Sequence, residues 1–338
     1  MAREAATQSF DNAARALNLD WGTSFDGKQI QRWGEALGLT LVQRRQKELG
    51  LFKKGVYPAS KSNEHELLVI GMDGGRVQTK EKSLETGSRW KEDKVLTISS
   101  CLKGDGLEKP PKKLLSTCVA TMADAIAFAH LARMEAERRG IRNAVEVIGI
   151  HDGGNWIDPL WEEHFGCHQR ILDYYHAAEH LHEAARAAHP ADGNAASVLA
   201  EELETMLWEG QIDCVLDRLR QLSAQAGNPA EGDGPGHPRR VLWTNINYFQ
   251  THRNHTDYPS YRASPTFALL TSDPHYLAPI AEKGAQVSTT RWGIQADVCA
   301  SSGSGISSFP LRIRGGGWAG SFSPSFSSSI SCSGSGSV

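Results

Sequence analysis

The sequence predicts an α/β fold built on a mixed β-sheet, with helical segments before and after it. Two apolar runs, Leu67–Met72 and Val145–His151, are the main support. Short runs rich in Val, Ile and Leu are typical of interior strands that are buried on both faces. Each run is followed by an aspartate and two glycines, at Asp73 and Asp152. Acids at the carboxyl ends of strands lie where α/β sheets place their chemistry.

An Asp-Gly pair after an apolar run also predicts a tight hairpin turn. For Asp73 this alternative stays open, because residues 76 to 80 could form the returning strand. It fits Asp152 poorly, because Asp158 followed by a proline resembles the N-cap and first residue of a helix. We therefore expect the second run to be a strand that leads into a helix.

Helical and strand patterns alternate along the rest of the chain. Three strands are expected within residues 66 to 101, the last of them at Lys94–Cys101, and a long helix at Lys113–Arg139 that Gly140 closes. The strand before Asp152 and a short helix come next. The strand Gln169–Asp173, helices to about Gln225 and a last helix at Arg239–His252 follow. This order favours a ribonuclease-H-like mixed sheet over a doubly wound one, because the first three strands lack crossover helices. We expect that domain to span residues 61 to 262, with a helical insertion at about 177 to 255.

The two ends of the chain differ in composition and in apolar pattern. Residues 1 to 60 show a helical pattern, with Ile30, Trp33 and Leu37 at helical spacing and basic residues at Arg44 and Arg45. This region predicts either a small helix-turn-helix-like, DNA-binding module or a helical cap with solvated basic side chains. Residues 263 to 338 are irregular, and from residue 301 onward they are mostly Ser and Gly with no acid and no lysine. That composition predicts a disordered tail.

Composition narrows the class of protein. The chain has 338 residues, 40% of them hydrophobic, and a net charge of -3, so bulk charge gives no indication of a nucleic-acid partner. Six cysteines lack the paired spacing of a disulfide scaffold or a CxxC zinc site: Cys101, Cys118, Cys167, Cys214, Cys299 and Cys332. Together with the absence of an apolar signal or a run of ~20 apolar residues, this predicts a cytoplasmic protein without a membrane span.

The two aspartates predict a shared metal site. In a ribonuclease-H-like sheet, acids from the first and fourth strands lie side by side. Two carboxylates ~4 Å apart repel by roughly 4 kcal/mol at an effective dielectric constant of about 20, and a cation between them would relieve that repulsion. Oxygen ligands favour Mg²⁺ or Mn²⁺, and two such ions support in-line phosphoryl transfer. We therefore predict that Asp73 and Asp152 are catalytic metal ligands.

A second polar cluster offers a different chemistry. His176-x-x-Glu179-His180 has the spacing of an inverted zincin motif, with two histidines on one helical face and a carboxylate base beside them. On this alternative the protein is a zinc metallopeptidase. The same residues also fit a structural role, in which histidine and glutamate pair on a solvated helix face.

Four blocks in the chain resemble a known family. They are Met72–Gln78, His151–Ile157, Ile171–Leu181 and Tyr248–Arg262, and they occur in that family's order. The chain resembles the DDE transposases of ISKra-type insertion sequences over roughly residues 15 to 262. The resemblance implies metal-dependent strand cleavage and joining on double-stranded insertion-sequence DNA, and it leaves open a homo-oligomer.

By this resemblance Asp73 and Asp152 are the first two acids of a catalytic triad. Asp173 and His176 match a D-x-x-H pair thought to help position DNA, and Glu179 lies beside them as a supporting residue. The resemblance displaces the zinc peptidase, because it accounts for an aspartate at the end of a strand three residues before the histidine.

The chain departs from the family at the third acid. The family has a glutamate just after the block that ends at Arg262, and here the nearest acids are Asp273 and Glu282. Asp273 precedes a proline, which disfavours helix, and Glu282 lacks the family's surrounding motif. The loss of pattern after Arg262 suggests, as a hypothesis, a truncation or a frameshift. We therefore expect a degenerate copy with severely reduced catalysis.

DNA binding can outlast the loss of catalysis, because contacts from Lys and Arg to phosphates supply most non-specific affinity. Lys80, Lys103, Lys112 and Lys113 are the predicted contributors, although solvated surface is the simpler role of each. A non-catalytic DNA-binding remnant is therefore an alternative function.

Overall fold

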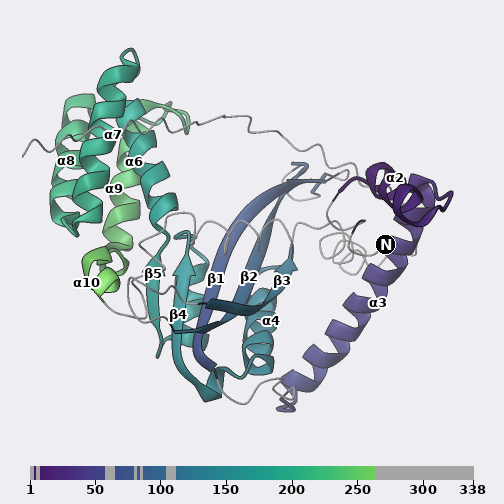
Figure 1. Ribbon diagram of the computed structural model, residues 1–338. Coiled ribbons are helices and arrows are strands. Elements are labelled where there is room, and N and C mark those ends of the chain that lie inside the picture. Colours follow the sequence, from purple (N-terminus) through teal and green to yellow (C-terminus); the bar gives the residue numbers. More distant parts are fainter. Residues whose placement is uncertain are drawn as a thin grey trace, which may run out of the picture.

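A five-stranded mixed sheet forms the centre of the fold, with its strands in the order β3-β2-β1-β4-β5 (Figure 1). The computed structural model describes residues 4, 8–57, 65–79, 82–83, 87–103 and 112–263. The strands are β1 His65–Gln78, β2 Trp90–Leu102, β3 Lys112–Thr121, β4 Ala144–His151 and β5 Gln169–Leu172. Pairing is antiparallel from β1 to β2 to β3, and parallel from β1 to β4 to β5. The predicted mixed α/β class is confirmed.

The long strand β1 decides between a turn and a strand at Asp73. β1 continues past Asp73 to Gln78, and it pairs with β2 along this whole length, Asp73 opposite Val95 and Arg76 opposite Glu92. The hairpin alternative was wrong, because the residues that would have returned instead extend the same strand. The described residues between 65 and 102 therefore form two strands, where the sequence pattern predicts three.

The third strand lies where a helix was expected. Residues from Lys112 to Thr121 form β3, and the helix α4 begins only at Ala125 and ends at Arg138. The helix starts there because the Asp124 side chain accepts a hydrogen bond from the Ala127 N–H, at 2.7 Å. β3 lies at the edge of the sheet with Leu114 and Leu115 about half exposed, so it lacks the alternating pattern of a half-buried strand.

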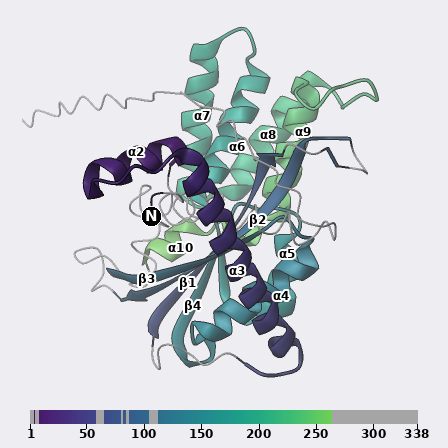
Figure 2. The same cartoon turned by 90° about the vertical axis from the view of Figure 1, so that its right-hand side faces the viewer.

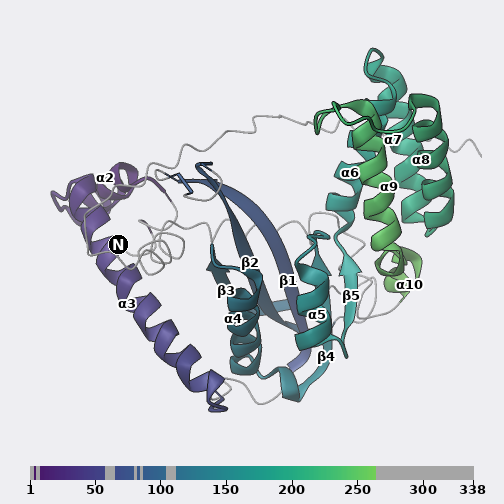
Figure 3. The same ribbon diagram turned by 180° about the vertical axis from the view of Figure 1, so that it is seen from behind.

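Helices α4 and α5 (Ile157–Phe165) cover one face of the sheet (Figure 3). Their apolar side chains share a core with β1, β2 and β4, and Phe128, Trp161 and Phe165 are among its buried aromatic residues. Trp161 lies so close to β4 that a Cβ atom on Gly149 would be 2.0 Å from its ring. The N-cap of α5 is Trp156, and Asp158 lies inside the first turn, so the predicted N-cap was wrong by two residues.

A group of helices packs against the other side of β4 and β5 (Figure 1). It comprises α6 Tyr174–Ala188, α7 Gly193–Trp208, α8 Ile212–Ala226 and α9 Pro238–Thr251, followed by a 3-10 turn at Arg253–His255 and by α10 Tyr258–Ala263. A single apolar core joins these helices to β1, β4 and β5, and it includes Leu67, Ile150, Leu181 and Phe249. The helices are thereby fixed relative to the carboxyl ends of β4 and β5.

Two N-terminal helices, α2 Phe10–Trp21 and α3 Gly27–Lys53, pack on each other through a small core of Ala13, Leu17 and Ile30. Figure 2 shows the C-terminal part of α3 passing alongside α4. There Glu48 forms an ion pair with Arg138 of α4, and Arg45 donates to the carbonyl of Ala120 at 3.2 Å. These contacts favour a helical cap for the second half of α3.

Candidate functional site around Asp73 and Asp152

Asp73 and Asp152 lie side by side on neighbouring strands. Met72 of β1 pairs with His151 of β4 in parallel register, so the two aspartates come next on adjacent chains. Their carboxyl groups are hydrogen-bonded to each other. The Asp152 carboxylate also accepts from the N–H of Gly74 at 3.2 Å and of Gly154 at 2.9 Å. The predicted pair is therefore brought together.

The surroundings of Asp73 disfavour its ionised form. Burial, the charge of Asp152, their hydrogen bond and the more distant charge of Asp173 together raise the pKa of Asp73 from 3.8 to about 7. A hydrogen bond from the Gly74 N–H acts in the opposite direction. Near neutral pH the pair therefore binds a proton that a divalent cation could replace.

Asp173 lies next to this pair, but its carboxylate caps a helix. β5 ends at Leu172, and Asp173 is the N-cap of α6, accepting from the Tyr175 N–H at 2.9 Å. Its own N–H donates to the carbonyl of His151 at 2.8 Å, which ties the ends of β4 and β5 together. Burial raises the pKa of Asp173, and the charge of Asp152 adds to that effect.

The three residues of the zinc motif lie on α6, but in different surroundings. Glu179 is exposed and His176 is half-buried, and their side chains lie 3.8 Å apart. His180 faces inward: its ring stacks on Tyr248 at 3.8 Å between centroids, and its Nδ1 lies 2.7 Å from Oδ1 of Asn245. Among the residues that the structure describes, no three His, Cys, Asp or Glu side chains are placed to hold one metal ion.

The turn after Asp152 is held from behind by α9. Gly153 has a φ of 88°, a backbone conformation that favours glycine. The Tyr248 hydroxyl donates to the carbonyl of Asp152 at 2.8 Å, and Nε2 of His252 lies 3.0 Å from the carbonyl of Gly153. No sequence pattern predicts a role for either side chain, and only the Tyr248–Arg262 block indicates this segment.

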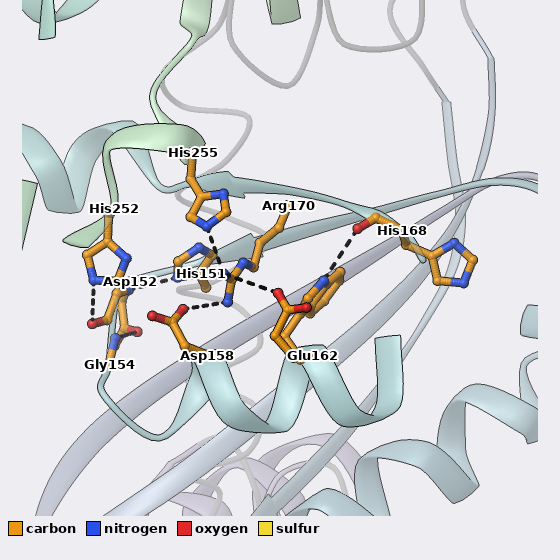
Figure 4. Close-up of polar contacts among 11 residues, drawn as sticks. His151, Asp152, Gly154, Asp158, Glu162, His168, Arg170, His252 and His255 are labelled. Atoms are coloured by element: carbon orange, nitrogen blue, oxygen red, sulfur yellow. Dashed lines mark hydrogen bonds and ion pairs between the residues drawn. The ribbon is translucent and has the colours of Figure 1, made fainter. Parts of the chain in front are cut away.

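A buried cluster centred on Arg170 supports the same turn (Figure 4). Arg170 of β5 forms an ion pair with Asp158 of α5, and its Nη2 lies 2.7 Å from Nε2 of His255. The rings of His252 and His255 lie 5.5 and 5.6 Å from that of His151. Burial lowers the pKa of His151, and burial and the charge of Arg170 lower the pKa of His255 to about 4. The histidines are therefore neutral at physiological pH, and the cluster acts as a scaffold.

Another buried carboxyl lies on the same face of the sheet as Asp73. Asp93 pairs with Gly75, two residues after Asp73, so its side chain emerges on the same face. It is 1% exposed, its Oδ1 has no hydrogen-bond partner among the residues that the structure describes, and burial raises its pKa. A Cβ atom on Gly75 would lie 2.6 Å from that oxygen, so the second glycine of this segment makes room for Asp93.

A hollow opens beside Asp152 on the side of the sheet that α5 covers. Its lining residues come from β1, β2 and the turn before α5: Gly74, Gly75, Arg76, Glu92, Asp152, Gly154, Asn155 and Trp156. The Trp156 ring packs edge-to-face on Phe128 at 5.2 Å, and Nζ of Lys94 lies 5.7 Å from its centroid. The hollow therefore joins a candidate catalytic acid to an arginine and an indole ring.

The predicted basic residues are placed unevenly. Lys113 is exposed on β3, while Lys103 is ion-paired with Glu146 at 2.8 Å. Lys112 begins β3, but its side chain lies outside the described part, as does all of Lys80. Asp273 and Glu282, the candidates for a third acid, also lie outside the described residues.

Comparison with protein-family models and with curated proteins gives no match. None of the helices that the structure describes is long and apolar enough to cross a membrane. The geometry of the site is therefore what indicates a function for this chain.

Proposed function

We propose that this chain is a ribonuclease-H-like protein of the DDE transposase type, in which Asp73 and Asp152 hold Mg²⁺ or Mn²⁺ for phosphoryl transfer on double-stranded DNA. The main support is the side-by-side placement of the two acids on parallel strands β1 and β4. The strand order β3-β2-β1-β4-β5, with an antiparallel half and a parallel half, is the one expected for that fold.

The residues present fit a divalent cation. Two oxygen-donor side chains lie side by side in a partly buried position. Burial and the charge of Asp152 raise the pKa of Asp73, and a cation between the two carboxylates would offset their repulsion. When bound, the ion would supply Lewis-acid activation of a water or a 3′-hydroxyl and stabilise the leaving oxygen. The chain's own part is positioning: two backbone N–H groups orient the Asp152 carboxylate, and Tyr248 holds its backbone carbonyl.

Two alternative functions have less support from the structure than metal-dependent phosphoryl transfer. A DNA-binding remnant without catalysis is favoured by the shortage of ligands, since the described part offers two acids at the site and no group of three that could hold an ion. The zinc peptidase is less favoured, because Asn245 and Tyr248 engage the His180 ring in packing and hydrogen bonding.

Manganese binding tests the proposal directly. Electron paramagnetic resonance of free Mn²⁺ should show binding by the wild-type chain at pH 8, and Asp73→Asn or Asp152→Asn should each abolish it. The matched control is Asp20→Asn, an exposed acid on α2. Unchanged Mn²⁺ binding in both site variants, or stoichiometric zinc that is lost on His180→Ala, would overturn the proposal.

A further inference from the structure

The hollow beside Asp152 is kept open by glycines. A Cβ atom on Gly74 would lie 3.4 Å from Nε1 of Trp156 and 3.8 Å from Oδ2 of Asp152. A Cβ atom on Gly154 would lie 3.1 Å from the same indole nitrogen and 3.3 Å from Oδ1 of Asp152. Both added atoms would occupy the space between the indole N–H and the carboxylate. A side chain at either glycine would therefore narrow the hollow at this point, where the indole N–H is a hydrogen-bond donor.

Arg76 supplies a positive charge at the rim. It stands directly opposite Glu92 on the paired strands, yet Glu92 forms its ion pair with Lys94, at 3.1 Å. Arg76 is exposed, and within the described part of the chain its guanidinium has no ion pair and no hydrogen bond. The indole N–H of Trp156 likewise has no acceptor there. Two donors that could bind an anion are thus left free on neighbouring walls of one hollow.

We propose that this hollow binds a backbone phosphate of DNA, next to the phosphate on which the metal-holding acids would act. Arg76 would provide charge and the Trp156 N–H a directed hydrogen bond. Two carboxylates also line the hollow: Glu92 is neutralised by Lys94, and Asp152 by the cation when it is bound. The inference rests on the proposed function, and it adds which side of the sheet the DNA strand follows, over Gly74 toward the start of α5.

Salt-dependent DNA binding tests this assignment. Fluorescence anisotropy of a labelled short duplex, titrated in Mg²⁺ across a range of NaCl concentrations, reports both affinity and the number of phosphate contacts. Arg76→Gln should weaken binding and lower the slope of log K against log salt by about one. Trp156→Phe keeps an aromatic ring, although a smaller one, and removes the donor, so it should weaken binding about tenfold with little change in slope.

The controls separate this inference from the proposed function. Arg240→Gln, at an exposed arginine on α9, should leave both the affinity and the slope unchanged. Circular dichroism should first show that Arg76→Gln and Trp156→Phe are folded. If both variants then bind DNA like Arg240→Gln, the phosphate site is excluded, even if Asp73 and Asp152 bind Mn²⁺. If they lose DNA binding while the wild-type chain fails to bind Mn²⁺, the phosphate site stands and the metal site falls.

Free phosphate is the other source of the same chemistry. Inorganic phosphate, added at constant ionic strength, should not displace the duplex from the wild-type chain. Displacement that disappears in Arg76→Gln would assign the hollow to a free phosphate and overturn the DNA assignment.

Discussion

The two Asp-Gly-Gly segments have the same sequence but different structures. At Asp73 the chain remains extended, and β1 runs on for five more residues while pairing with β2. At Asp152 the strand stops, and Gly153 turns the chain with a φ of 88° toward α5. One aspartate therefore lies within a strand, and the other lies in a turn whose backbone is held by Tyr248 and His252.

This difference comes from the neighbours of each segment. β2 lies beside the first segment and offers backbone partners as far as Trp90, so continuing the strand satisfies its N–H and C=O groups. β4 has lost its ladder partners after His151, and groups on α9 take their place. Tertiary contacts, rather than the local sequence, therefore decide whether an Asp-Gly-Gly segment extends or turns.

Replacing the glycine after each aspartate should give the largest contrast. Gly153→Ala should lower the free energy of unfolding by about 3 kcal/mol, because alanine is strained at this φ. Its Cβ would also lie 2.6 Å from the Tyr248 ring and 2.9 Å from Nε2 of His252. Gly74→Ala, whose Cβ would meet nothing closer than 3.4 Å, should change stability by less than about 1 kcal/mol. Urea unfolding measures both, and equal effects would contradict the comparison.

The fold was predictable where the apolar pattern was strong. The runs before Asp73 and Asp152 predicted the two central strands, and the helix spacing after Tyr174 predicted α6. β3 was not predictable in the same way, because an edge strand with exposed Leu114 and Leu115 has no periodic face. Its true boundary signal was Asp124, the N-cap of α4, which separates strand from helix.

The site was predictable in its acids but not in its support. Asp73 and Asp152 follow from the apolar runs before them, since parallel neighbours in register place them together, but only Asp152 lies at a strand end, because β1 continues past Asp73 to Gln78. Tyr248 and His252 lie about a hundred residues further along the chain, and only the packing of α9 brings them to the turn. The role proposed for Arg76 could not be predicted from the sequence either. Its guanidinium is available to a ligand because Glu92, the residue opposite it, forms its ion pair with Lys94 instead.

Changing the charge of Asp73 should have the next largest effect. Its pKa is raised from 3.8 to about 7, so the folded state holds a proton that the unfolded state releases. Stability should therefore fall as pH rises from about 4 to about 7 and stay low above that range. Asp73→Asn removes this loss, and at pH 8 it should be more stable than the wild-type chain by about 2 kcal/mol.

The readout is the difference between two profiles of unfolding free energy against pH, wild type minus Asp73→Asn. Titration of the neutral histidines, including His255, cancels in that difference. Asp20→Asn on α2 provides the control and should track the wild-type chain. Parallel profiles for the wild-type chain and Asp73→Asn between pH 4 and pH 8 would show that Asp73 is not perturbed.

The smallest predicted effect separates holding the turn from general stability. Tyr248→Phe removes the hydrogen bond to the Asp152 carbonyl and should cost about 1 kcal/mol. Tyr258→Phe removes a hydrogen bond of similar length, 3.0 Å, to the carbonyl of Leu172 on β5 rather than to the backbone of a predicted metal ligand, and should cost about as much. Only Tyr248→Phe should also weaken Mn²⁺ binding, by about tenfold, because it loosens a group that orients a ligand. Equal Mn²⁺ affinity in the two variants would mean that the turn after Asp152 keeps its shape without the Tyr248 hydroxyl. Gly153 alone would then account for the difference between this turn and the extended strand after Asp73.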